Sequence, residues 1–390
     1  MKKSMKKILA VVLALTVVLA CFAACGKNDG GETDNVIKIG SIGPLTGDNA
    51  VYGTAVRNGA ELAVKEINAA GGINGMQIEF KMEDDVCDAE KSVNAYNNLI
   101  DWGMDILVGT VTTGACLAVA KKTAADNIFQ LTPSASGDDV VSSDNCFQVC
   151  FTNSNQGSAS ADYIADNALA KKVAVIYDSS SDYSAGIYNS FKAEAAVKGL
   201  EIVAAEAFTA DSKTDFTSQL SKAKNAGAEL VFLPIYAAEA ASILKQANDM
   251  GFKTQFFGCD GLDGMLDIDG FDGKLAEGTM LLTPFAKNAS DDTTKKFVAA
   301  YEAAGYADDE LNQFAADAYD AIYIIKAAAE KAGVTKEMSA SEICDALKGA
   351  MTQISVDGVT GSAMSWKATG EVNKGPKAVK IVNGAYSAME

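Results

Sequence analysis

The sequence predicts an α/β protein with two lobes, each built around a parallel β-sheet. Three observations lead to this fold class. Strand-length and helix-length patterns alternate along the chain, they do so in two successive series that divide near Gly157, and 390 residues exceed the roughly 250 to 300 at which a single core stops growing. Hydrophobic residues make up 48% of the chain, which is enough to fill two cores.

The first series of elements begins at Val36. Residues 36–42 alternate as a strand, and residues 43–47, with two glycines and a proline, interrupt it. Apolar residues then recur at helical spacing up to Ile67, and Gly71 and Gly72 end that helix. The series continues with a strand at 76–82, a helix at 88–101, a strand at 105–108, a helix ending at 126 and a strand at 128–131. This alternation predicts a parallel sheet.

The second series follows Gly157 and has the same alternation. Its expected elements are helix 158–168, strand 173–177, helix 185–198, strand 200–208, helix 215–226, strand 230–235, helix 238–250 and strand 254–257. A strand at 280–283 and helices at 291–304, 311–331 and 339–350 come last. This tail has too few strands for a third sheet, so we expect it to pack on the first lobe, and the chain then crosses between the lobes more than once.

The first 25 residues have the pattern of a lipoprotein signal peptide. Four lysines precede an apolar run at 8–20, which is shorter than the roughly 20 residues that span a bilayer, and small residues precede Cys25. We expect residues 1–24 to be removed, Cys25 to carry the lipid, and residues 25–35 to form a polar tether; cleavage before Cys21 is the alternative. The folded body is therefore expected outside the cytoplasm, lipid-anchored to the cell membrane.

Charge and composition exclude several classes of function. The formal net charge is −18 and Arg57 is the only arginine, so nucleic acid is not an expected partner. The chain has no histidine, which removes the common Ser-His-Asp relay, and it has no CxxC spacing for zinc. We expect no cofactor, no metal and no enzymatic activity, although a secreted hydrolase of the Ser-Lys or paired-carboxylate kind stays open as an alternative.

Polar side chains follow the expected strands of both lobes. In open α/β sheets, ligands bind beyond the carboxyl ends of the strands. The candidate residues there are Thr113, Ser134 and Ser136 in the first lobe and Tyr183, Tyr236 and Asp260 in the second. Hydroxyl and backbone N–H groups suit a carboxylate, whereas an acid with tyrosine oxygens suits an ammonium group. Each residue type also caps helices or forms turns, but their shared position predicts a site for a zwitterion.

Several segments in the same order resemble the extracellular branched-chain amino-acid binding proteins. They are residues 59–75, residues 39–47 followed by Tyr52 and Gly53, Asp84 and Asp85 before Cys87, and residues 245–258. The similarity extends over nearly everything from Val36 onward. It implies the substrate-binding lipoprotein of an ABC importer, a monomer that delivers leucine, isoleucine or valine to membrane permease subunits. A different small zwitterion or amide is the alternative ligand.

The resemblance also implies an architecture and roles for residues. The fold would be the type I periplasmic-binding one, with two Rossmann-like lobes joined by three hinge crossovers: residues 36–151 with 286–366, and residues 152–285 with 367–390. Thr113 and Ser136 would donate to the ligand carboxylate with backbone help near Ser134. Asp260 would hold the ammonium group, Tyr183 and Tyr236 would close from the second lobe, and Tyr52 would cover the side-chain pocket.

The sequence departs from the family pattern at two positions. Leucine-binding relatives pair a cysteine like Cys87 with one at the position of Thr112, which here is not a cysteine, so a Cys87–Cys116 bridge is possible but not established. Asp260 is one carbon shorter than the glutamate often found at its position, which bears on ammonium geometry and ligand choice.

Overall fold

The computed structural model describes residues 35–306 and 311–389. The expected signal peptide, the lipidation site at Cys25 and residues 25–34 of the tether lie outside the described residues. The described residues from Val36 onward form one compact unit, and the description below concerns this unit alone. Within the described ranges, no helix has the length and apolar character needed to cross a membrane.

The first sheet is fully parallel and has the strand order β2-β1-β3-β4-β5. Its strands are β1 (Val36–Gly43), β2 (Gln77–Asp84), β3 (Ile106–Gly109), β4 (Phe129–Thr132) and β5 (Cys146–Gln148). The central strands β3 and β4 are buried throughout, because helices cover both faces of the sheet.

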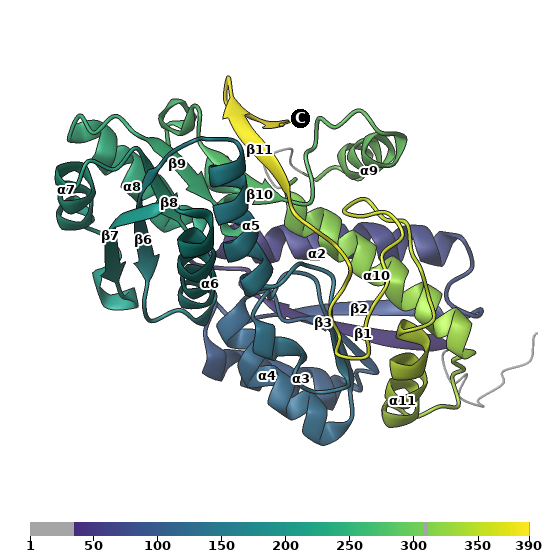
Figure 1. The fold of residues 1–390 in the computed structure, drawn as a ribbon. Coiled ribbons are helices and arrows are strands. Elements are labelled where there is room, and N and C mark those ends of the chain that lie inside the picture. The colour runs from purple at the N-terminus through teal and green to yellow at the C-terminus, as the bar shows by residue number, and fades with distance from the viewer. Residues whose placement is uncertain (1–34, 307–310, 390) are drawn as a thin grey trace, which may run out of the picture. The chain divides into compact units, whose positions relative to one another are not determined.

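Helices α2 and α10 lie side by side on one face of this sheet, and α3 and α4 cover the other (Figure 1). Their bounds are α2 (Ala50–Ala69), α3 (Ala89–Trp102), α4 (Thr113–Asp126) and α10 (Gln313–Ala332); α11 (Ala340–Met351) packs near β4. Ile37 and Ile39 point into the core beneath α2 and α10, whereas Ile42 and Leu107 pack with Leu99 on the other face.

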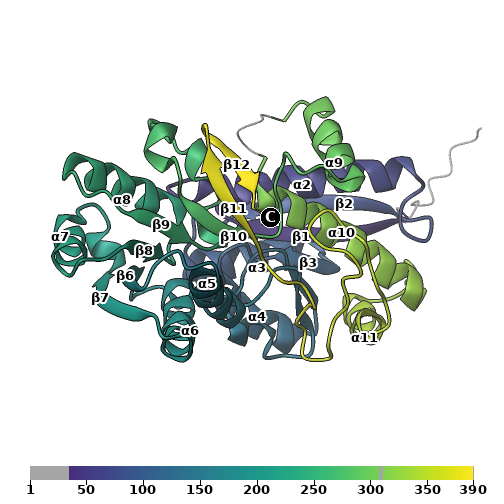
Figure 2. The ribbon, with the colours of Figure 1, turned by 45° about the horizontal axis from the view of Figure 1, so that its top comes forward.

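The second sheet has the order β12-β11-β10-β9-β8-β6-β7. Its strands are β6 (Lys172–Asp178), β7 (Glu201–Phe208), β8 (Leu230–Leu233), β9 (Gln255–Gly258), β10 (Met280–Thr283), β11 (Lys377–Val382) and β12 (Ala385–Ala388). Strands β6 to β10 are parallel, and β11 and β12 add an antiparallel edge. Figure 2 shows α5 (Asn153–Asp166) and α6 (Asp182–Lys198) on one side and α7 (Thr217–Asn225) and α8 (Ala237–Asp249) on the other.

The chain passes between the two sheets three times. It leaves the first sheet after β5, returns after β10 through α9 (Asp292–Ala303) to α10, and joins the second sheet again at β11. The prediction that the helical tail packs on the first sheet is confirmed for α10 and α11. The expected element list lacked β5, β11 and β12, which are short or lie at an antiparallel edge.

Two helices begin earlier than the apolar pattern indicates, because a hydroxyl caps each of them. The Thr152 side chain accepts a hydrogen bond from the Asn155 N–H, so α5 starts at Asn153 instead of residue 158. The Ser181 side chain accepts one from the Ser184 N–H, so α6 starts at Asp182 instead of residue 185. The second shift places Tyr183 in the first turn of α6, where it faces the ends of the strands.

The Cys87–Cys116 bridge that the sequence left possible is not formed. All six cysteines in the described part of the chain are free thiols. The Cys87 thiol lies 3.5 Å from the Thr112 hydroxyl, and the Cys116 sulfur accepts a hydrogen bond from the Gln130 side-chain amide at 3.2 Å.

Candidate functional site

The carboxyl ends of strands from both sheets converge on one small cavity of about 20 Å³. Six of the seven predicted ligand residues line it: Tyr52, Thr113, Ser134, Tyr183, Tyr236 and Asp260. Val111, Thr112, Gly261 and Phe314 complete the wall. Residues from β3–α4 and β4 loops thus meet residues from the β8–α8 and β9 loops across a shared space.

Asp260 is the acidic wall of this cavity. It lies in the 3-10 helix η3 (Asp260–Leu262) after β9 and is only 3% exposed. Its Oδ1 accepts a hydrogen bond from the Tyr183 hydroxyl at 2.6 Å, and its Oδ2 accepts one from the Gln156 side-chain amide at 2.8 Å. Burial raises the pKa of Asp260 to about 7 against the lowering effect of the Tyr183 hydrogen bond, and the Asp317 charge raises it further. A cation beside this carboxylate would relieve the unfavourable burial of its charge.

The opposite wall is made of hydroxyls at the start of α4. Thr113 is the first residue of that helix, and its Oγ1 accepts a hydrogen bond from the Ser136 N–H at 3.2 Å, which leaves the hydroxyl hydrogen to donate elsewhere. No side chain caps the N-terminus of α4. The Ser134 hydroxyl donates to the Val111 carbonyl at 2.7 Å. An anion is favoured here by the helix N–H groups and the Thr113 hydroxyl.

Ser136 does not line the cavity. Its hydroxyl donates to Asn153 Oδ1 at 2.8 Å, and its N–H donates to the Thr113 hydroxyl oxygen. Because Asn153 begins α5, this contact joins the first sheet's loop to the first helix on the second sheet. Ser136 therefore lies one contact behind the cavity wall in this structure.

Three tyrosines close the cavity. The Tyr52 hydroxyl donates to the Gly261 carbonyl at 2.7 Å and accepts from the Ala237 N–H at 2.8 Å. A residue of α2 is thus hydrogen-bonded to η3 and to the start of α8, which follow strands of the second sheet. The rings of Tyr183 and Tyr236 stack with centroids 4.9 Å apart. Burial raises the pKa of all three hydroxyls well above the usual value, which keeps them neutral.

This arrangement is suited to binding a small molecule that carries both charges. It combines one buried acid, one helix N-terminus and neutral hydroxyls. A zwitterion with its carboxylate at α4 and its ammonium at Asp260 would satisfy both walls.

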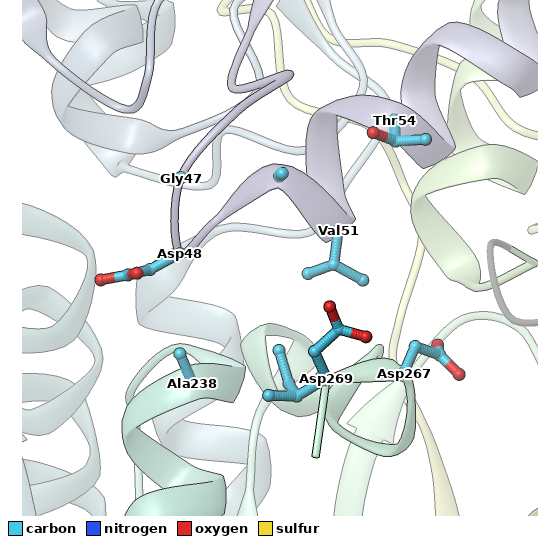
Figure 3. Close-up of a pocket in the computed structure, with 9 residues that line it drawn as sticks. Gly47, Asp48, Val51, Thr54, Ala238, Asp267 and Asp269 are labelled. Atoms are coloured by element: carbon cyan, nitrogen blue, oxygen red, sulfur yellow. The ribbon is translucent and has the colours of Figure 1, made fainter. Parts of the chain in front are cut away.

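Two larger cavities are present, and one of them adjoins the small one. One, of about 310 Å³, lies between α4, the β6–α6 loop and the start of α8, and shares Thr112 and Tyr236 with it. The other, of about 420 Å³, lies at the first turn of α2. Figure 3 shows Val51 of α2 pointing toward the segment that carries Asp267 and Asp269, with Ala238 of α8 at the side. Its wall carries carboxylates but none of the predicted ligand residues.

Comparison with known proteins places this fold and site in a family. A family model described as periplasmic binding protein matches residues 36–385. The chain belongs to the periplasmic binding protein family. This membership confirms the two-lobe α/β fold and the expectation of a binding protein instead of an enzyme.

Curated and solved relatives agree with this membership. The Leu/Ile/Val-binding protein homolog 3 of Brucella melitensis is 35% identical over 78% of this chain and 81% of its own length. The leucine-, isoleucine-, valine-, threonine-, and alanine-binding protein of Pseudomonas aeruginosa is 30% identical over 86% of this chain and 88% of its own. The branched-chain amino acid transporter substrate binding protein LivJ of Streptococcus pneumoniae, in complex with isoleucine, superposes with a TM-score of 0.80, is 32% identical, and covers 90% of this chain and 98% of its own.

Two residues at or behind the cavity wall were absent from the sequence prediction: Phe314 lines the cavity, and Gln156 contacts Asp260 from behind the wall. Gln156 is fully buried in the first turn of α5, donates to Asp260 Oδ2, and accepts the Asp260 N–H at 3.3 Å. Phe314 is the second residue of α10, and its ring lies edge-on to that of Tyr52 with the centroids 4.9 Å apart. Gln156 lies in a polar run with no periodic pattern, and Phe314 reaches the cavity only through the second chain crossing. Neither residue therefore had a local sequence pattern that pointed to the cavity.

Proposed function

We propose that this periplasmic binding protein captures a branched-chain aliphatic amino acid outside the cytoplasm and delivers it to the permease subunits of an ABC importer. The observation that carries the proposal is the pairing of Asp260 with the uncapped start of α4 across one cavity. A free α-amino acid has the two charges that these walls favour. Relatives named for leucine, isoleucine and valine binding support the choice of ligand.

The proposal includes movement of two lobes. We assign residues 36–151 with 286–366 to one lobe and residues 152–285 with 367–390 to the other, joined by the three chain crossings. The cavity of about 20 Å³ holds little more than one water molecule, so an amino acid enters only when the lobes separate or the tyrosines move. Hinge closure of this kind is one of the recurring conformational changes of two-lobe binding proteins.

The proposal also includes a lipid anchor at Cys25 and a monomeric state. The support for the anchor is the N-terminal sequence pattern alone. Membrane fractionation of cells that produce the Cys25→Ala variant tests the anchor: the protein is expected in the soluble fraction, and retention in the membrane would refute lipidation at this residue.

Thermal unfolding with added amino acids tests the ligand. Leucine, isoleucine or valine at about 100 times Kd should stabilise the protein by about 2.7 kcal/mol, which raises Tm by several degrees. Asp260→Asn should abolish most of this rise, because it removes the negative charge that pairs with the ammonium group.

Asp249→Asn is the matched control. It removes the same charge from an exposed position at the end of α8, where Asp249 pairs with Lys245. The control should keep the full rise in Tm. The absence of a rise with every aliphatic amino acid, in a wild-type protein that unfolds cooperatively, would refute the proposed function.

A further inference from the structure

The compartment of about 310 Å³ beside the ligand cavity carries an inference about ligand chemistry. The two spaces share the walls Thr112 and Tyr236. The smaller space has room for little more than one water molecule, so a ligand held at Asp260 and Thr113 needs further volume for its side chain. The adjoining compartment has that volume.

The compartment has an apolar wall and a polar wall. Val86, Ala89 and Ala115 form the apolar wall on the side of the first sheet, next to the Cys87 thiol. The polar wall comes mainly from the loops of the second sheet: Asp178, Ser180, Ser181, Asp182, Lys213 and Glu239, with Asn49 opposite. An aliphatic side chain can therefore leave the ligand cavity along the apolar wall, and its far end meets polar groups.

Two buried acceptor atoms of this compartment's residues have no hydrogen-bond partner. They are Glu239 Oε2 and Asn49 Oδ1. Glu239 is 9% exposed, and burial raises the pKa of its carboxyl group. Its Oε1 pairs with Lys213 Nζ at 3.4 Å, and Lys213 also pairs with Asp48 at 2.8 Å. Buried acceptors without donors are rare in native proteins, because each forfeits the hydrogen bonds that it makes in water. They indicate that a ligand brings N–H groups to this compartment.

We propose that this compartment binds the side chain of an α-amino acid that ends in a primary amide, with Glu239 and Asn49 as its acceptors. The inference rests on the proposed function and widens its ligand class beyond branched-chain aliphatic amino acids. A primary amide carries two N–H hydrogens, which matches the two unpartnered oxygens. A primary amide is also neutral. An ammonium end would face the Lys213 ammonium group, and a carboxylate end would face Glu239, Asp178 and Asp182.

Titration calorimetry with leucine, glutamine and glutamate tests the inference. Glutamine should bind with a Kd within about tenfold of that of leucine, and glutamate should bind at least about 100-fold more weakly than glutamine, because it has the same length without the N–H groups. In Glu239→Met, the ratio of the glutamine Kd to the leucine Kd should rise about tenfold, since one acceptor is replaced by an apolar group of similar size. Leucine binding by the same sample shows that the variant is folded.

Asp249→Asn, which also removes a negative charge from α8, serves as the control and should leave the ratio as in the wild type. Binding of leucine but not glutamine by the wild type overturns the inference and leaves the proposed function in place. An unchanged ratio in Glu239→Met overturns the assignment of Glu239. Failure of leucine, isoleucine and valine alike overturns the proposed function.

Discussion

At the scale of single residues, Tyr52 joins the parts of the molecule that form the site. It is buried in the first turn of α2, yet its hydroxyl bonds the Gly261 carbonyl in η3 and the Ala237 N–H at the start of α8. These hydrogen bonds exist only while the loops lie against α2. In the proposed hinge motion, their contribution would stabilise the closed arrangement and would be absent when the lobes separate.

Tyr52→Phe should weaken amino-acid binding about tenfold, mainly through faster dissociation. The variant keeps the ring and its contact with Phe314, but it leaves two backbone groups without a partner in the closed state, a loss of about 1 to 2 kcal/mol. Stopped-flow measurement of the dissociation rate checks this. Tyr188→Phe is the control, because the Tyr188 ring stacks on Tyr177 at 4.2 Å within α6 and β6, away from the cavity. Equal rates in both variants would contradict the role of the Tyr52 hydroxyl.

The sequence predicted cavity-lining residues that follow strand ends and missed residues that reach the cavity region by helix packing. Asp260, Thr113 and Tyr236 lie two to four residues beyond the ends of β9, β3 and β8, so the rule for parallel sheets places them at the cavity. Gln156 and Phe314 depend on where α5 and α10 come to rest, which no local pattern encodes. Ser136 shows the converse limit: it lies in the loop after β4, but its hydroxyl donates to Asn153, a residue of the next helix, and does not line the cavity.

At the scale of elements, a buried ion pair connects the third chain crossing to α10. Lys374 Nζ lies 2.7 Å from Asp317 Oδ1, and each side chain is 2% exposed. Lys374 also donates to the Thr360 hydroxyl at 2.7 Å, and Thr360 in turn donates to Asp320 at 2.6 Å. The segment before β11 is thus tied to α10 by charge and hydrogen bonds instead of by regular secondary structure.

Lys374→Ala should lower the free energy of unfolding by about 3 to 5 kcal/mol, because it leaves the Asp317 carboxylate buried without a cation. The double variant Lys374→Met with Asp317→Leu should recover most of this loss, since it removes both charges and keeps apolar volume. Urea unfolding of the wild type and the variants measures both effects. A double variant no more stable than Lys374→Ala would show that the pair itself, and not the isolated charge, accounts for the loss.

The predicted helices and strands agree with the structure where the periodic pattern of apolar residues is long. The helices and strands of both α/β series were expected within a few residues, because apolar spacing of 3.6 or 2 residues repeats in each. Strand β5 has only three residues, and β11 and β12 pair antiparallel at a sheet edge after a stretch without helical spacing. These three strands form only against neighbouring strands of the folded sheet, and a local sequence pattern carries no information about those neighbours.

At the scale of the whole molecule, buried acids with raised pKa values lie on both sides of the site. Burial raises the pKa of Asp260 and Asp263 to about 7 and that of Asp85 and Asp320 to about 6. An unfolded chain would titrate all four near 4. Between pH 4 and these raised pKa values, the folded state binds more protons than the unfolded state. The stability that comes from these protonated carboxyl groups is therefore complete below about pH 4 and is lost as the pH rises through 6 to 7.

The ligand-free protein should therefore be less stable at pH 8 than at pH 5, by at least about 2 kcal/mol. Exposed acids with lowered pKa values, such as Asp215 and Glu229, stabilise the folded state when ionised. This stabilisation is lost only as the pH falls below about 4, so it does not affect the range from pH 5 to 8. Urea unfolding between pH 5 and 8 measures the slope, and Asp260→Asn should make it shallower because one titrating group is gone. A bound amino acid should flatten it as well, since its ammonium group lowers the pKa of Asp260 in the folded state. A stability that stays constant or rises from pH 5 to 8 without ligand would show that these carboxyl groups are not held protonated in the fold.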